Sequence, residues 1–217
     1  MPLPPFSDSD LAAIRAAVEE AERSTSGEIV PYVVAASDGY LEAAWKGAAF
    51  GAFLAALGAW GIYRWGGFWG GQLFLWMVVP PAAGGAVGFL AVHSLAPLRR
   101  ALAGHEVMAH RVEQRAAAAF LEQEVWKTRR RTGILLFLSL FERRVKVLGD
   151  SGIHQQVEEG EWDEVVRQVV HGIRAGNPGA ALVAAIGECG SLLARHGLTR
   201  QAGDVDELSD ELRQGKP

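Results

Sequence analysis

The sequence has little cysteine and only a small excess of negative charge. Cys189 is the only cysteine, so no intramolecular disulfide can form, which fits a reducing compartment. The formal net charge is −4, which gives no basis for nucleic-acid binding. Residues 1–40 lack a basic segment followed by an apolar one. We therefore expect no cleavable signal peptide and an N-terminus that stays in the cytoplasm.

Catalytic motifs are also scarce in the sequence. There is no phosphate-binding loop of the Walker type. His105 and His110 come close to a zinc-binding histidine pair, but a spacing of five residues turns them about 140° apart on a regular helix. Cys189 has no basic neighbour in sequence that would activate it and fits a small buried residue better than a nucleophile. We expect no catalytic residue and no cofactor, which favours a non-enzymatic protein.

The charged residues leave two long gaps. Residues 47–63 and 73–97 contain no Asp, Glu, Lys or Arg. At 1.5 Å per residue the first run forms a helix of about 25 Å, close to the ~30 Å of a hydrocarbon core, and the second run is longer. The alternative is two buried helices of a soluble protein, which the aromatic residues at the boundaries argue against. These are Trp45, Trp60, Tyr63, Trp65, Trp69 and Trp76. We predict a two-helix transmembrane hairpin over residues 41–98.

The connection between the two runs is too short to hold a domain, so both flanking segments must lie on one side of the membrane. Lys46, Arg99 and Arg100 stand beside the membrane on that side, against Arg64 alone in the connection. The excess of positive charge indicates the cytoplasmic side. We therefore expect a two-pass protein of the inner (cytoplasmic) membrane, in contact with membrane lipid, with both termini in the cytoplasm.

Four glycines in the hairpin have the spacing that lets helices approach closely. They are Gly47, Gly51, Gly84 and Gly88. They either pack the hairpin against itself or dock it onto the transmembrane helices of a partner. Pro80 and Pro81 are expected to kink the second helix. His93 is the one ionisable group in the second run and a candidate tetrapyrrole ligand, although a histidine near a helix end more often forms a hydrogen bond at the interface.

The remaining segments read as alternating helices and strands. Ser7 caps a first helix that ends near Ser24, and the mostly apolar stretch Glu28–Val34 forms a strand that Pro31 places at an edge or a bulge. A long helix over about 98–130 precedes a central strand at 134–140. Val145 and Val147 lie on a half-buried strand joined to it by a hairpin. Further helices are expected at 161–174 and from 178 to about 196, followed by an acidic segment at 198–217 that is a tail or a partner-binding helix.

These elements predict an α/β sandwich, with helices packed on a small central sheet, that the hairpin divides into residues 1–40 and 99–197. Three stretches carry a family resemblance: Glu19–Ile29, Arg131–Leu135 and Glu142–Ile153. Their order and spacing resemble the TPM-domain family, in its bacterial branch with an interrupting membrane segment. The resemblance implies a sheet flanked by helices in an accessory protein of membranes. The family includes photosystem II assembly and repair proteins, regulators of a membrane receptor, and members described as acid phosphatases or calcium binders.

The acidic cluster of that family does not map clearly onto this sequence. Asp150 is a candidate metal ligand, and further carboxylates follow at 158–164, although a turn with a helix cap also explains Asp150. We expect a non-catalytic, membrane-anchored accessory or assembly subunit of a larger membrane complex, photosynthetic or respiratory, that binds transmembrane helices and no nucleic acid. The alternative is a membrane-tethered, metal-dependent phosphatase, which requires Asp150 and the later carboxylates to converge.

Overall fold

A computed structural model describes residues 6–66, 73–200 and 207–215. The chain divides into two compact units. The α/β unit comprises Met1–Asp38 and Ala109–Pro217, and the helical unit comprises Gly39–Met108.

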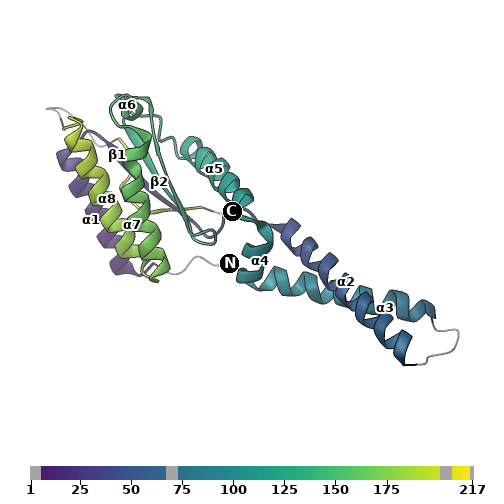
Figure 1. The fold of residues 1–217 in the computed structure, drawn as a ribbon. Coiled ribbons are helices and arrows are strands. Elements are labelled where there is room, and N and C mark those ends of the chain that lie inside the picture. Colours follow the sequence, from purple (N-terminus) through teal and green to yellow (C-terminus); the bar gives the residue numbers. More distant parts are fainter. Residues whose placement is uncertain (1–5, 67–72, 201–206, 216–217) are drawn as a thin grey trace. The chain divides into compact units, whose positions relative to one another are not determined.

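A four-stranded sheet forms the centre of the α/β unit (Figure 1). Its strands are β1 (Glu28–Val34), β2 (Gly133–Ser139), β3 (Arg144–Gly149) and β4 (Arg213–Gly215), in the order β3-β2-β1-β4. β1 runs parallel to both β2 and β4, whereas β2 and β3 form an antiparallel pair. The predicted central strand, and the β-hairpin that it forms with the next strand, are therefore confirmed.

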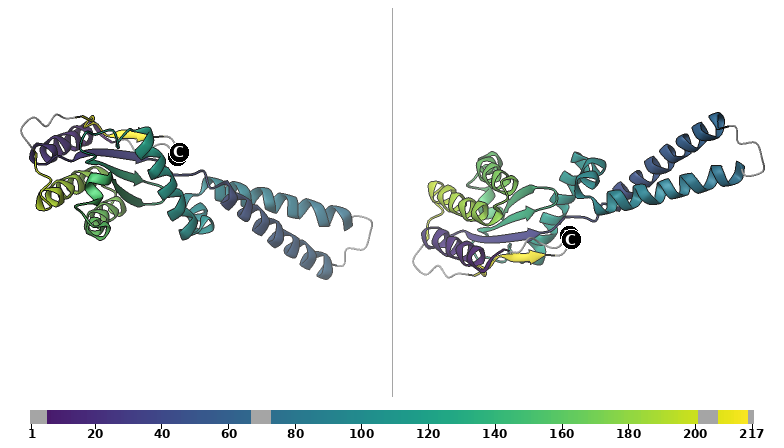
Figure 2. Two further views of the ribbon diagram at one scale, coloured as in Figure 1. Left: turned by 90° about the horizontal axis from the view of Figure 1, so that it is seen from above. Right: turned by 90° about the horizontal axis from the view of Figure 1, so that it is seen from below.

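Helices cover both faces of this sheet (Figures 1 and 2). On one face pack α1 (Asp8–Ser24), α7 (Asp163–Arg174) and α8 (Pro178–Arg195), and on the other lies α5 (His105–Glu122). A short helix α6 (Ser151–His154) and a 3₁₀ turn (Glu159–Trp162) join β3 to α7. The α/β class with a sheet flanked by helices is thus as the sequence predicts.

Strand alternation sends side chains into two separate cores. On β1, Ile29 and Val33 pack against α1, α7 and α8, whereas Val30 and Tyr32 pack toward α5. Every residue of β1 and β2 is buried. This explains why the strands read as continuous apolar runs rather than as alternating patterns.

The predicted edge position of β1 is wrong, because β2 and β4 flank it. Even-numbered residues of β1 bond toward β2, as the Glu28 N–H bond to Thr132 O shows, so Pro31 faces the side of β4. β4 pairs only with Tyr32–Val34. The amide that Pro31 lacks therefore leaves no bond of the ladder unmade.

The single long helix expected over 98–130 is also wrong. The structure has α4 (Ala96–Ala103), then Gly104 with φ of +86°, then α5, which ends at Glu122. Glycine adopts a positive φ without steric cost, so Gly104 separates the two helices. After α5 the chain turns through Thr128, whose hydroxyl oxygen accepts a hydrogen bond from the Thr132 N–H at 3.0 Å.

The predicted acidic segment at 198–217 carries a strand in its described part rather than a free tail or a helix. Thr199 forms an antiparallel bridge with Thr25. The N–H groups of Glu207 and Leu208 donate to Glu28 Oε2 at 3.3 and 3.2 Å, and β4 follows beside β1, in yellow in Figure 2. These long-range contacts leave no pattern in the local sequence.

The helical unit is a hairpin of α2 (Leu41–Trp65) and α3 (Leu73–Ser94), followed by α4. α3 continues through Pro80 and Pro81. Among the described residues, the segment Phe74–Ser94 is the one helix that is long and apolar enough to cross a membrane. Two packed helices are present where the sequence predicts them, whereas the two-helix transmembrane hairpin stays a prediction.

Candidate functional site

Four glycines bring the backbones of α2 and α3 into contact. A Cβ atom on Gly47 would lie 2.8 Å from the Gly88 carbonyl oxygen, and one on Gly84 would lie 2.5 Å from that of Gly51. A Cβ atom on Gly51 or Gly88 would overlap the facing backbone even more. The structure thus places all four glycines, the glycine seam, inside the hairpin. Docking onto a foreign helix would have to use other residues.

The outer surface of the hairpin exposes large apolar side chains. Phe50 is 63% exposed, Phe74 is 72% exposed and Val87 is 67% exposed. Similar residues follow both helices: Phe53, Leu54, Leu57, Ile62, Leu75, Met77, Val78, Val79 and Leu90. Large exposed apolar surfaces are typical of sites that contact a membrane or another protein.

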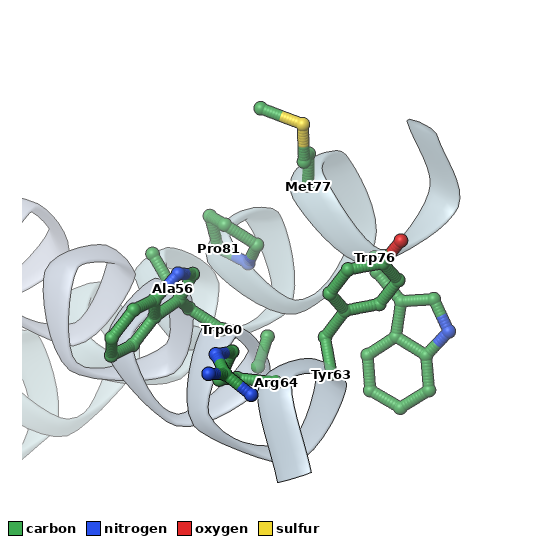
Figure 3. Close-up of a pocket in the computed structure, with 8 residues that line it drawn as sticks. Ala56, Trp60, Tyr63, Arg64, Trp76, Met77 and Pro81 are labelled. Atoms are coloured by element: carbon green, nitrogen blue, oxygen red, sulfur yellow. The ribbon is translucent and has the colours of Figure 1, made fainter. Parts of the chain in front are cut away.

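A pocket of about 360 Å³ lies between α2 and α3 at the end of the hairpin that leads to the connection. Figure 3 shows the aromatic and aliphatic side chains around it and the guanidinium group of Arg64. The lining residues are Ala56, Ala59, Trp60, Tyr63, Arg64, Trp76, Met77 and Pro81. Arg64 is the one charged residue among them, so the site combines an apolar interior with a single positive charge.

The predicted interface residues fall into three groups. Trp60, Tyr63 and Trp76 meet at this pocket, and Trp65 beside them is 86% exposed. Trp45 lies near the start of α2, where its ring packs edge-on against Phe89 at 5.3 Å between centroids. Arg99 and Arg100 lie on α4. Trp69 is outside the described residues.

His93 lies near the end of α3, and its ring stacks on that of Phe89. The ring centroids are 5.9 Å apart and the ring planes differ by 7°. Its side chain is exposed. The stacking fixes the ring plane but supplies no pocket for a tetrapyrrole. The role of His93 as a ligand stays a prediction.

Asp150 is occupied by partners from its own unit. It is buried, its Oδ1 accepts from the Ser151 N–H at 2.6 Å as the cap of α6, and its Oδ2 lies 3.2 Å from Nε of Arg131. The Arg131 guanidinium also lies 5.8 Å from the centre of the Trp126 ring. The carboxylate therefore balances an arginine, as a helix cap and ion pair.

The later carboxylates have separate partners. Glu161 accepts from the Glu158 N–H at 3.0 Å and lies 2.8 Å from Nε2 of His196. These bonds, the backbone one first, lower the pKa of Glu161. Glu164 pairs with Arg167. Within the described ranges, no three His, Cys, Asp or Glu residues gather as metal ligands do, and the role of Asp150 as a metal ligand stays a prediction.

Sequence reasoning missed a buried polar cluster at the carboxyl ends of β1 and β2. The Glu142 carboxylate accepts from the Ser37 N–H at 2.9 Å and from the Ser139 hydroxyl, and the two serine hydroxyls lie 3.0 Å apart. Ligands of open α/β sheets often bind at this edge. Here the carboxylate ties two loops together. The contacts of Ser37 with Glu142 and Ser139 span more than 100 residues of sequence, so no local sequence pattern predicts them.

A second cluster lies under α5. Nη2 of Arg115 donates to the Tyr32 hydroxyl at 2.8 Å, while Nη1 contacts Glu122 at 3.1 Å. The Tyr32 ring also stacks on Phe137, at 5.8 Å between centroids. The cluster anchors α5 to the sheet.

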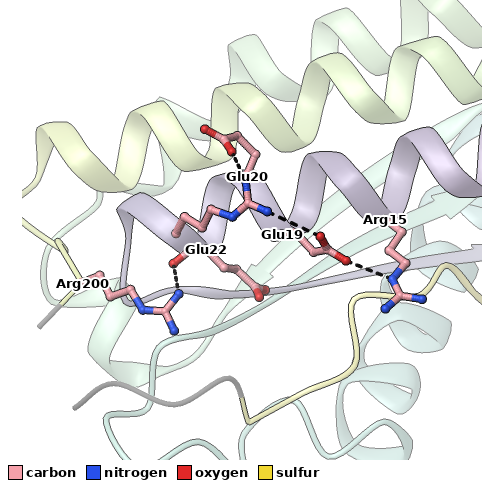
Figure 4. A network of polar contacts seen from close by, with 6 residues as sticks. Arg15, Glu19, Glu20, Glu22 and Arg200 are labelled. Carbon is pink, nitrogen blue, oxygen red and sulfur yellow. Dashed lines mark hydrogen bonds and ion pairs between the residues drawn. The ribbon is translucent and has the colours of Figure 1, made fainter. Parts of the chain in front are cut away.

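Cys189 and the ion pairs on α1 offer no reactive group. Burial raises the pKa of Cys189 to about 12, so the thiol stays protonated and inert. On α1, Glu19 contacts both Arg15 and Arg23, and Arg200 donates to the Glu22 carbonyl (Figure 4). The ion pairs on α1 are largely solvent-exposed, and such pairs contribute at most about 1 kcal/mol each.

Comparisons with known proteins agree with this fold. A family model described as the TPM domain matches residues 99–192, so the resemblance predicted from the motifs is confirmed over that segment. The NMR structure of the BA42 protein from the psychrophilic bacterium Bizionia argentinensis superposes with a TM-score of 0.60 at 18% sequence identity. That match covers 98% of this chain and 97% of BA42. It shows a shared fold. No curated protein matches the chain.

Proposed function

We propose that the chain is a non-catalytic accessory subunit of a larger membrane complex, anchored by α2 and α3. The observation that carries the proposal is the apolar surface of this hairpin, where Phe50, Phe74 and Val87 are each more than 60% exposed. Exposure of such side chains to water is unfavourable, by about 25 cal/mol for each Å² of apolar surface. A bilayer or the helices of a partner removes that cost.

The orientation follows from the positions of the cations. Lys46 donates to the Leu102 carbonyl at 3.0 Å, and Arg99 and Arg100 follow on α4, all at the open end of the hairpin. Arg64 alone stands at the other end. The positive-inside rule then favours a cytoplasmic position for the open end, the α/β unit and both termini.

The polar groups of the α/β unit support an accessory role rather than catalysis. Asp150, Glu142 and Glu161 are all engaged in capping or in ties between segments. A phosphatase needs a positioned nucleophile or metal and a group that transfers a proton. The described residues supply neither arrangement, so the phosphatase alternative has no structural observation in its favour.

Membrane insertion and topology are tested on the full chain in bacterial cells. We expect the chain to remain in the pellet after alkaline carbonate extraction. A fluorescent protein fused to the C-terminus should fluoresce, and alkaline phosphatase fused there should be inactive, because the latter folds only outside the cytoplasm. Alkaline phosphatase inserted after Gly66 should be active. The reverse pattern would overturn the orientation, and extraction by carbonate would overturn the anchor.

The accessory role is tested by purification in mild detergent. We expect other membrane proteins to co-purify in fixed ratio, and the purified chain to hydrolyse p-nitrophenyl phosphate no faster than background with or without Ca²⁺ or Mg²⁺. Metal-dependent hydrolysis that Asp150→Asn abolishes would establish the phosphatase instead.

A further inference from the structure

The pocket at the connection end of the hairpin combines an apolar lining with one positively charged side chain. Ala56, Ala59 and Pro81 line it with apolar surface, and Arg64 is its one charged lining residue. We propose that this pocket binds one anionic phospholipid, with an acyl chain in the apolar interior and the phosphate on Arg64. The inference rests on the proposed insertion of the hairpin into a membrane.

The hollow follows from where the glycine seam ends. The seam joins the backbones of the two helices at Gly47 and Gly51 of α2 and at Gly84 and Gly88 of α3, and the side chains of Ala55 and Val92 pack against it. Beyond it, the facing residues of α2 recur at positions 56, 59, 60 and 63, which lie on one side of a helix. The small side chains of Ala56 and Ala59 leave space there, and the rings of Trp60, Tyr63 and Trp76 lie around it (Figure 3).

The size and lining suit a lipid tail. The volume of about 360 Å³ falls within the ~300–1,000 Å³ of ordinary ligand pockets. Seven of the eight lining residues are uncharged, and three of these carry aromatic rings with a polar edge. Tryptophan and tyrosine favour the headgroup level of a bilayer, where one side of the ring is apolar and the other is wet. The pocket therefore lies at the depth where a lipid changes from tail to headgroup.

Arg64 decides the charge of the headgroup. It lies in the last turn of α2, and it makes no ion pair with a carboxylate anywhere in the described parts of the chain. A guanidinium group binds phosphate through two parallel hydrogen bonds, which are stronger than bonds between neutral groups. The headgroup of an anionic lipid carries no positive charge that would compete with Arg64 for the phosphate. A zwitterionic lipid brings its own ammonium group, so it gains less.

The test measures how many lipids the full chain retains in mild detergent. The chain is purified with phosphatidylglycerol or phosphatidylcholine, and native mass spectrometry counts the bound molecules. We expect one retained phosphatidylglycerol and an affinity about tenfold above that for phosphatidylcholine, which corresponds to one charge-assisted contact. Arg64→Gln should bring the ratio close to one. Ala59→Leu, which fills the interior, should lower retention of both lipids.

Arg99→Gln is the matched control, because it removes the same charge from α4 and lies outside the pocket. We expect it to leave the lipid ratio unchanged. Equal lipid ratios for Arg64→Gln and the parent chain, both resistant to carbonate, would overturn the lipid site and leave the anchor intact. Release of the parent chain by carbonate would instead overturn the proposed function.

Discussion

Glu161 shows how a single exposed carboxylate ties the 3₁₀ turn Glu159–Trp162 to the end of α8. It accepts the N–H of Glu158 and lies 2.8 Å from Nε2 of His196. Both contacts favour the charged form, so the pKa of Glu161 falls below its ordinary value of 4.5. A lowered pKa in the folded state adds stability above pH 4.5, and that stability disappears as the pH falls through the lowered pKa.

Glu161→Gln should therefore destabilise the fold near neutral pH and have a smaller effect in acid. The amide keeps the shape of the side chain but removes the charge that the two donors favour. Urea unfolding of the parent and the variant, followed by circular dichroism at pH 7 and at successively lower pH, measures the difference. The two midpoints should converge below pH 4.5. A difference that stays constant with pH would show that the carboxylate charge contributes nothing.

The glycine seam acts at the scale of two helices. The Cβ atom of an alanine at position 88 would overlap the backbone of Gly47, and backbone cannot yield as a flexible side chain can. Gly88→Ala should therefore force α2 and α3 apart. We expect a loss of about 1–3 kcal/mol, typical of overpacking, seen as a lower midpoint of thermal unfolding in detergent.

Gly58→Ala is the internal control for this prediction. Gly58 lies on α2, and a Cβ atom added there would meet no atom within 4 Å beyond the neighbouring backbone of its own helix, so the new methyl group points into open space. In a helix, alanine is favoured over glycine by about 1 kcal/mol, and the variant should be as stable as the parent or more so. Equal losses in the two variants would show that the seam does not depend on close backbone contact.

β4 is a short element whose contribution can be measured by removing it. The carboxylate of Glu28, which is buried, binds the amides of Glu207 and Leu208, and Arg213–Gly215 pair with β1. A chain ending at residue 206 leaves that carboxylate without these two donors and exposes one edge of β1. We expect a loss of about 1–3 kcal/mol in urea unfolding. A chain ending at Gly215 should match the parent, whereas equal stability of all three would mean that 207–215 is a free tail.

At the scale of the whole chain, the sequence predicts the elements better than the contacts between them. The strand Glu28–Val34 has the same bounds in both, because its apolar residues and flanking turn residues are local signals. β4 escapes prediction because Arg213–Gly215 has no strand pattern and is defined by its pairing with β1. The break at Gly104 could not be predicted, because the sequence does not show that this glycine has a positive φ rather than a helical one.

The candidate site also combines residues that the sequence predicts with contacts that it does not predict. Trp60, Tyr63 and Trp76 are predictable as interface residues from composition and position. The pocket that they line depends on where the glycine seam ends, which is a property of two packed helices. The cluster of Ser37, Ser139 and Glu142 joins residues more than 100 positions apart, and no single sequence reveals such a pair.

The insertion of the helical unit into the α/β unit leads to the last prediction. The chain leaves the α/β unit at Asp38 and returns at Ala109, and these ends lie close together because Nε of Arg111 contacts Oδ2 of Asp38 at 2.9 Å. A linker of about six glycine and serine residues spans up to about 20 Å. It should therefore replace residues 41–104 without strain, in the way that domains tolerate insertions between neighbouring ends.

We expect this shortened chain to be soluble without detergent and to unfold cooperatively in urea, because both cores of the α/β unit come from residues outside the deleted segment. Its Cys189 should resist thiol reagents until the chain unfolds, since burial raises the pKa of this thiol to about 12. Sedimentation, circular dichroism and thiol labelling measure these properties. Aggregation with rapid labelling of Cys189 would show that the α/β unit needs the hairpin in order to fold, and that the hairpin is more than an anchor.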